Sequence, residues 1–91
     1  MAGTPPEVGR KVRRFVQGMT REERMLVVLR TELYDGSWDE MVSDLQARLT
    51  GRPYIFKLAH RIEDDLDRIG RLRGFEVSCG VDLGEYVRME D

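Results

Sequence analysis

The sequence of 91 residues has little of what covalent cross-links and catalytic centres need. It contains one cysteine, Cys79, and one histidine, His60. A single cysteine excludes an intramolecular disulfide framework and a cysteine-based zinc site, and it favours a reducing, cytoplasmic location. His60 stands off the apolar stripe of its segment, so we expect a surface or boundary residue rather than a general base. A catalytic centre built on Cys79 and His60 is therefore not expected.

Long apolar runs and ligand-binding motifs are also missing. No apolar run approaches the roughly 20 residues that a membrane-spanning helix needs, and the first residues, MAGTPPEVGRK, lack the apolar core of a signal peptide. There is no phosphate-binding loop, dinucleotide motif or nucleophile elbow. The acidic run Glu63–Asp67 cannot wrap one metal ion, because consecutive helical residues point about 100° apart. We therefore expect a soluble, non-enzymatic protein with no cofactor, no metal, no membrane contact and no small-molecule substrate.

Charged residues make up 35% of the sequence and are unevenly distributed. Residues 1–30 contain seven basic and three acidic side chains, a net +4, whereas the remaining residues contain eight and fourteen, a net −6. The two parts are complementary, which suits the assembly of protein chains as well as an anionic partner. Near the N-terminus, one basic strip is either a phosphate contact or the solvated side of a helix: Arg10, Lys11, Arg13 and Arg14.

Helix start signals recur along the chain. A capping residue is followed three positions later by glutamate at Thr4/Glu7, Thr20/Glu23, Ser37/Glu40 and Asp82/Glu85. Together with the spacing of apolar residues, these signals predict helices over residues 5–17, 21–34, 38–49 and 53–73 and a short helical turn over 82–88, after a flexible segment 1–4. No stretch alternates at period two for long enough to predict a strand. The sequence is therefore typical of an all-α protein.

Short connections between the predicted helices favour antiparallel neighbours. We expect a single domain over residues 1–91, a small four-helix bundle with short loops and a short C-terminal helical turn. The helix over 21–34 is apolar almost all round at Met25–Leu29 and should lie centrally. Tyr34 and Trp38 are expected to anchor the turn that follows it.

Apolar residues remain after the core stripes are assigned, and they predict an interaction surface. Tyr54, Ile55 and Phe56 are consecutive, so one helical face cannot hide all three. Tyr86 and Val87 either complete the core or contact another chain. The predicted partner contacts are Tyr54, Phe56, Tyr86 and Val87. We expect a protein-interaction or accessory module, with a homodimer as one form of assembly.

Three stretches, TREERMLVVLR, GSWDEMVSDL and PYIFKLAHRIEDDL, resemble the DNA-binding C-terminal domain of bacterial sigma factors over about residues 20–66. The resemblance implies a supporting helix over 38–49 and a recognition helix that begins near Pro53. It places four side chains toward the DNA groove: Arg52, Tyr54, Lys57 and Arg61. The chain departs from the pattern at Val42, where a small residue is usual, and at Glu63–Asp67, which would repel phosphates. DNA binding is the alternative function.

Overall fold

The computed structural model describes residues 6–51 and 56–87, with side chains described for 6–50 and 60–87. Within these ranges the chain forms α1 (Pro6–Gln17), α2 (Arg21–Leu33), α3 (Trp38–Gly51), α4 (Phe56–Cys79) and α5 (Leu83–Val87), and no strand. The predicted all-α class is confirmed. No helix in the described ranges is long and apolar enough to cross a membrane.

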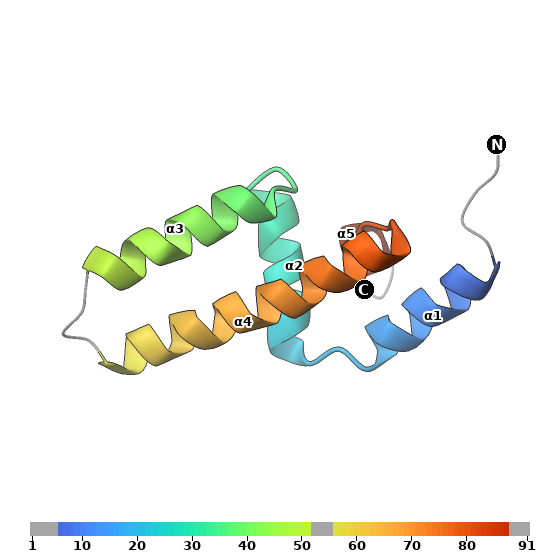
Figure 1. The fold of residues 1–91 in the computed structure, drawn as a ribbon, viewed down its shortest axis with the longest axis horizontal. Helices are drawn as coiled ribbons and strands as arrows, with labels where there is room; N and C mark the ends of the chain where they lie inside the picture. The colour runs from blue at the N-terminus through green and yellow to red at the C-terminus, as the bar shows by residue number, and fades with distance from the viewer. Residues whose placement is uncertain (1–5, 52–55, 88–91) are drawn as a thin grey trace.

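The helices form a small, elongated bundle (Figure 1). α3 and α4 lie side by side and run antiparallel, so they form an arm that extends beyond α2. α2 crosses α4 and also contacts α5, while α1 packs against α5 at the end of the molecule away from the arm. The principal extents are 50 × 24 × 23 Å. The short α5 therefore links α1 to the rest of the bundle.

The start of α2 carries the capping box that the sequence predicts. The Glu23 backbone N–H donates to Thr20 Oγ1 at 3.2 Å, and the Thr20 N–H donates to Glu23 Oε1 at 2.8 Å. At α3 half of the box is present, because the Glu40 N–H donates to Ser37 Oγ at 3.2 Å. Thr4 lies outside the described residues. The full box at Thr20 and the side-chain cap at Ser37 thus mark where α2 and α3 begin.

α4 is longer than its predicted range of 53–73, because it continues through Gly74 to Cys79. Glycine lowers helix stability by about 1 kcal/mol relative to alanine, but Phe75 supplies a tertiary anchor directly after it. The Phe75 ring stacks on Phe15 of α1 with centroids 3.8 Å apart. The helix stops at Gly80, whose φ of +67° is the left-handed conformation typical of a C-terminal cap. Packing of the last turns therefore outweighs the glycine.

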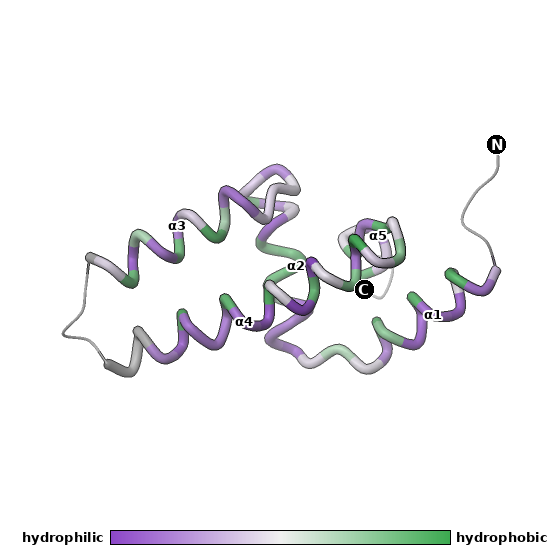
Figure 2. The backbone as a smooth tube through the Cα atoms, viewed as in Figure 1, coloured by the Kyte–Doolittle hydropathy of each residue, from purple (hydrophilic) through white to green (hydrophobic). Residues whose placement is uncertain are grey.

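The core lies where α1, α2, α4 and α5 meet the beginning of α3, and Figure 2 shows apolar segments on the facing sides of these helices. Its buried apolar members are Val12, Val16, Met19, Leu26, Val27, Trp38, Met41, Ile69, Leu72, Leu83 and Val87. The C-terminal segment therefore completes the core, which was one of the two roles that the sequence left open for it.

α2 lies in the middle of the fold, as its apolar run predicts, but it is not buried all round (Figure 1). Its inner face is buried, but its outer face exposes four large apolar side chains: Met25, Val28, Leu29 and Leu33. α4 and α5 both pack against α2, and no further helix in the described ranges is left to cover the other side. The run from Met25 to Leu29 thus divides between two faces of one helix, only one of which is used in the core.

Gly84 in α5 provides a test of this packing. A Cβ atom at position 84 would lie 2.7 Å from Thr31 Oγ1 and 3.0 Å from Asp82 Oδ1. Since both oxygens are held in hydrogen bonds, Gly84→Ala should lower the free energy of unfolding by about 1–3 kcal/mol. Thermal unfolding followed by circular dichroism measures the change.

The matched control is Gly74→Ala, where a Cβ atom would meet nothing within 4 Å. That change should stabilise α4 by up to about 1 kcal/mol, because alanine is the better helix former. If both alanines stabilise the protein equally, α5 is not packed against α2 as described.

Candidate functional site

The predicted contact residues fall in three structural situations. Arg52 and Tyr54 lie outside the described residues. Phe56 and Lys57 belong to the first turn of α4, and their side chains lie outside the described part of the chain. The remaining three predicted residues, Arg61, Tyr86 and Val87, have described side chains.

Of these three, Val87 requires a correction. It is only 3% exposed and belongs to the core, so the folded chain does not present it as a free surface contact. Tyr86 is half-buried against the same core. Arg61 is exposed and lines a hollow between the α3–α4 arm and α2. The C-terminal residues thus serve mainly to close the bundle.

The arrangement of α3 and α4 differs from a helix-turn-helix. The two helices lie alongside each other and run antiparallel (Figure 1), whereas the DNA-binding motif joins helices at about 90–120°. A recognition helix placed in a groove needs an exposed face that the supporting helix does not cover. The described part of α4 does have an exposed face, which includes Arg61 and the acidic residues Glu63 and Asp64. The departure from the motif is therefore the antiparallel packing of α3 on α4.

His60 and Cys79 lie on the same helix, α4, but near opposite ends of it. With a rise of about 1.5 Å per residue, the two side chains are separated by roughly 28 Å. His60 is exposed, with Nδ1 3.7 Å from Glu63 Oε1, and Cys79 packs against the core. These two residues cannot act as a nucleophile and base pair within this fold.

A polar network joins α2, α3, α4 and the residue before α5; it is buried at Arg30, Trp38 and Glu76 and exposed at Asp82. Glu76 Oε1 accepts hydrogen bonds from Arg30 Nη1 at 2.7 Å and from Trp38 Nε1 at 2.6 Å. Its other oxygen, Oε2, accepts from the Leu83 backbone N–H at 2.7 Å. Arg30 Nη2 donates to Asp82 Oδ1 at 2.6 Å, and the guanidinium carbon lies 4.2 Å from the centroid of the Trp38 ring. We call these four side chains, Arg30, Trp38, Glu76 and Asp82, the Glu76 network.

The Glu76 network is arranged to hold helices together rather than to carry out a reaction. Both carboxylate oxygens of Glu76 are occupied by protein donors, and Arg30 is 3% exposed. A buried charge that is paired and hydrogen-bonded is retained in the core, whereas an unpaired one is costly. Only Arg30 Nε lacks a hydrogen-bond partner among the buried side-chain atoms of the described residues. The network therefore fixes α5 and the start of α3 against α2 and α4.

Tyr34 and Trp38 flank the turn between α2 and α3, as the sequence predicts. The Tyr34 hydroxyl donates to Asp44 Oδ2 at 2.6 Å, and this hydrogen bond raises the pKa of Tyr34 above its ordinary value. Tyr34 consequently remains a protonated donor at neutral pH. Trp38 is buried and reaches Glu76. Tyr34 thus ties the turn to α3, and Trp38 ties it to α4.

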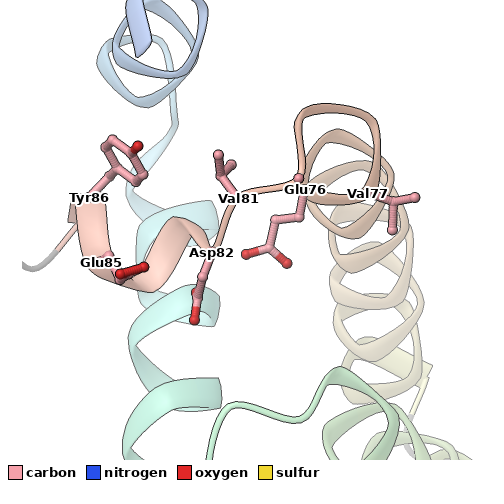
Figure 3. Close-up of a pocket in the computed structure, with 7 residues that line it drawn as sticks. Glu76, Val77, Val81, Asp82, Glu85 and Tyr86 are labelled. Atoms are coloured by element: carbon pink, nitrogen blue, oxygen red, sulfur yellow. The ribbon is translucent and has the colours of Figure 1, made fainter. Parts of the chain in front are cut away.

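A shallow hollow of about 540 Å³ lies beside the Glu76 network (Figure 3). Its lining includes Glu76, Val81, Asp82, Glu85 and Tyr86. Two of the three carboxylates, those of Glu76 and Asp82, are engaged by Arg30. No group of three or more metal-ligating side chains gathers anywhere in the described ranges. The carboxylates of Glu76 and Asp82 are therefore already paired within the bundle, which leaves Glu85 as the exposed carboxylate of the lining.

The outer face of α2 is formed by Met25, Val28, Leu29 and Leu33. These are four of the five large apolar side chains that are exposed in the described residues. Met25 is 54% exposed and Leu33 68% exposed, and Val28 and Leu29 are each more than one-third exposed. Contiguous exposed apolar side chains of this kind mark interaction sites on soluble proteins.

Two hollows flank this face. The larger, about 720 Å³, lies between α2 and the α3–α4 arm, and the smaller, about 280 Å³, lies between α2 and the end of α5. Arg21, Met25 and Leu29 line both hollows. The outer face of α2 is therefore a ridge with a depression on each side, a shape that can seat apolar side chains of a partner.

Sequence reasoning found the apolar run of α2 but assigned it to the core. One signal was available in the sequence. The run is apolar around almost the whole circumference of the helix, and a chain of 91 residues has too little other structure to cover every side of it. The Glu76 network carried no such signal, because its members are separated by up to 52 positions.

Comparison with family models, with curated proteins and with solved structures gave no match for this chain.

Proposed function

We propose that this protein is a non-enzymatic protein–protein interaction module that binds its partner on the outer face of α2. The observation that carries the proposal is the exposure of Met25, Val28, Leu29 and Leu33 on one side of a helix whose opposite side is buried. Burying a fully exposed side chain of this size gains about 1.5–3 kcal/mol. These four are between 36% and 68% exposed, so each retains only part of that gain, and covering all four together supports a complex.

The composition of the face supports the same proposal. Methionine and leucine on a helical ridge can adapt to different apolar surfaces, because methionine is unbranched and polarizable. Aliphatic residues without a nucleophile, a base or a metal ligand offer no means of catalysis but suit docking. A cytoplasmic location, favoured by the single cysteine, and self-association belong to this proposal as further expectations.

Replacement of Leu29 with glutamate tests the proposal. Leu29→Glu should abolish co-purification of the partner from the protein's own cells, because a buried carboxylate without a partner is unfavourable at an interface. Leu29 is outside the core cluster but only 37% exposed, so the variant should remain folded with a loss of about 1–2 kcal/mol in the free energy of unfolding, which circular dichroism checks.

The matched control is Val77→Glu on α4, where the side chain is 78% exposed and distant in sequence. Val77→Glu should retain the partner that Leu29→Glu loses. If both variants keep the same partner at the same yield, or both lose it, the outer face of α2 is not the docking surface.

DNA binding is the second candidate, and one observation favours it. The basic strip of α1, Arg10, Lys11, Arg13 and Arg14, is exposed, and none of these side chains lies within 4.0 Å of a carboxylate in the described residues. Fluorescence anisotropy of a labelled mixed-sequence duplex, first at low salt and then at about 0.2 M, distinguishes the two. Binding that collapses with salt supports phosphate contacts, and no binding at tens of micromolar removes general DNA affinity.

A further inference from the structure

The groove between α2 and the end of α5 combines an apolar floor with a basic rim. Its apolar lining consists of Met25, Val28, Leu29 and Val87. Both charged side chains that line it are arginines, Arg21 and Arg24. At about 280 Å³, the groove is below the usual size of a small-molecule site and suits two or three apolar side chains. We call it the α2–α5 groove.

The rim charges of the α2–α5 groove are not equally available. Arg24 Nη2 donates to the Val16 carbonyl oxygen at 2.6 Å, which fixes this side chain across the α1–α2 connection. Arg21 is exposed, and no carboxylate in the described residues lies within 4.0 Å of it. An exposed cation beside an apolar floor favours a ligand that brings its own negative charge. Arg21 is thus the rim residue on which recognition depends.

The surroundings of the groove extend the positive charge. α1 lies next to α5 at the same end of the molecule, away from the α3–α4 arm (Figure 1). The exposed basic strip of α1, Arg10, Lys11, Arg13 and Arg14, outnumbers the exposed glutamates of α1 and α5, Glu7 and Glu85, so the two helices together add positive charge at this end. By contrast, the larger hollow on the other side of α2 is lined by both acidic and basic residues. An anionic ligand is therefore attracted more strongly to the α2–α5 groove, whose charged lining is all basic, than to the larger hollow, whose lining has both signs.

The positions of the apolar residues indicate the form of the ligand. Met25, Val28 and Leu29 are spaced i, i+3 and i+4 along α2, which makes a ridge that another helix can pack against. Amphipathic helices dock in such grooves through apolar residues at i, i+3 or i+4, and i+7. A partner helix whose remaining positions are acidic would satisfy both the floor and the rim.

We infer that the α2–α5 groove binds an acidic amphipathic helix of another protein, with the apolar face of that helix on Met25, Val28 and Leu29 and its carboxylates at Arg21. The inference rests on the proposed function and specifies the chemical class of its partner. The basic strip of α1 raises the association rate by attracting the acidic helix, so binding weakens as salt is added.

Other occupants fit the groove less well. A second copy placed on a two-fold axis through the groove would bring the arginines of both copies together, and like charges oppose such an interface. A membrane surface requires an apolar face on the basic helix, but Val12 and Val16 of α1 are 0% and 1% exposed. Single-stranded nucleic acid requires aromatic side chains for stacking, and none lines the groove.

The test uses the full chain and synthetic peptides in fluorescence anisotropy. The probe is a labelled peptide of about 16 residues, long enough for a helix to form on binding, with leucine and phenylalanine at i, i+3, i+4 and i+7 and glutamate elsewhere. The control peptide carries lysine in place of each glutamate. The acidic peptide should bind at least tenfold more tightly than the lysine peptide, with an affinity that falls as salt rises.

Variants of the protein locate the binding. Val28→Glu should abolish binding, because Val28 lines the α2–α5 groove and does not line the larger hollow. Arg21→Glu, on the rim that both hollows share, should weaken binding by roughly tenfold while Arg21→Lys retains most of it. Arg48→Glu on α3 is the matched control, since it makes the same change in net charge in the larger hollow. It should change the affinity by less than about threefold, which is the effect of a remote surface charge.

Three results would overturn the inference. Equal or tighter binding of the lysine peptide, lost with Leu29→Glu, would leave the proposed function standing but remove the acidic partner. Binding of the acidic peptide that is lost with Arg48→Glu and kept with Val28→Glu would place it in the other hollow. Tight binding of the DNA duplex with no binding of either peptide would identify the basic end as a nucleic-acid contact.

Discussion

Replacing Glu76 with alanine should reduce the free energy of unfolding by about 3–5 kcal/mol, which is the usual cost of removing one partner from a buried ion pair. Arg30 would keep Asp82 but lose its buried partner, and the Trp38 indole N–H and the Leu83 backbone N–H would lose their acceptors. For a marginally stable domain of this size, such a loss approaches the whole stability. Chemical denaturation followed by the fluorescence of Trp38, the single tryptophan, measures it.

Two further variants show that the effect belongs to the Glu76 network. Glu76→Gln keeps one carbonyl oxygen but cannot accept at both positions, so its loss should fall between that of alanine and zero. Glu85→Ala removes an exposed carboxylate from the lining of the same hollow and should change stability by less than about 0.5 kcal/mol. Equal effects of Glu76→Ala and Glu85→Ala would contradict the network.

Leu72→Ala should cost about 2–5 kcal/mol, because it removes three buried carbon atoms and leaves a cavity. Leu72 is fully buried in the cluster that joins α1, α2, α4 and α5. Denaturant titration gives the change from the shift in midpoint at constant slope. Val77→Ala, five positions further along the same helix and 78% exposed, should leave the midpoint nearly unchanged.

The Leu72 result is sensitive to the path of α4. If α4 ended at Gly74, Leu72 would lie in a frayed last turn and its truncation would cost less than about 1 kcal/mol. A large loss for Leu72→Ala together with a negligible one for Val77→Ala supports a helix packed to its end. A small loss for both would show that the described core is wrong at this point.

Local signals were enough to predict most helix ends. Thr20 and Glu23 form the predicted capping box, and α2 begins where that box places it. These contacts join residues three positions apart, so they can be read directly from the sequence. The end of α4 could not be predicted in this way, since Gly74 is a local helix breaker whose cost is offset by the contact between Phe75 and Phe15, 60 positions away.

The candidate site was predictable only in part. The sequence indicated surplus apolar residues and predicted contacts at Tyr54, Phe56, Tyr86 and Val87; the first two lie outside the described side chains, and the exposed apolar face that the structure presents is on α2. Val87 is in the core because α5 folds back onto α2, an arrangement that depends on Arg30 meeting Asp82 and Glu76. A pairing of charges that are 46 and 52 positions apart leaves no periodic trace in the sequence.

The measurement that tests the central claim most directly is a methyl-detected NMR titration of the full chain with the acidic amphipathic peptide. Methyl groups of Met25, Val28 and Leu29 should shift first and saturate together, with Val87 following as the wall of the α2–α5 groove. Val77, which is exposed on α4 and lies outside this groove, should not move. Shifts at Val77 without shifts at Met25 and Leu29, or no methyl shift while the peptide binds, would contradict a docking surface on the outer face of α2.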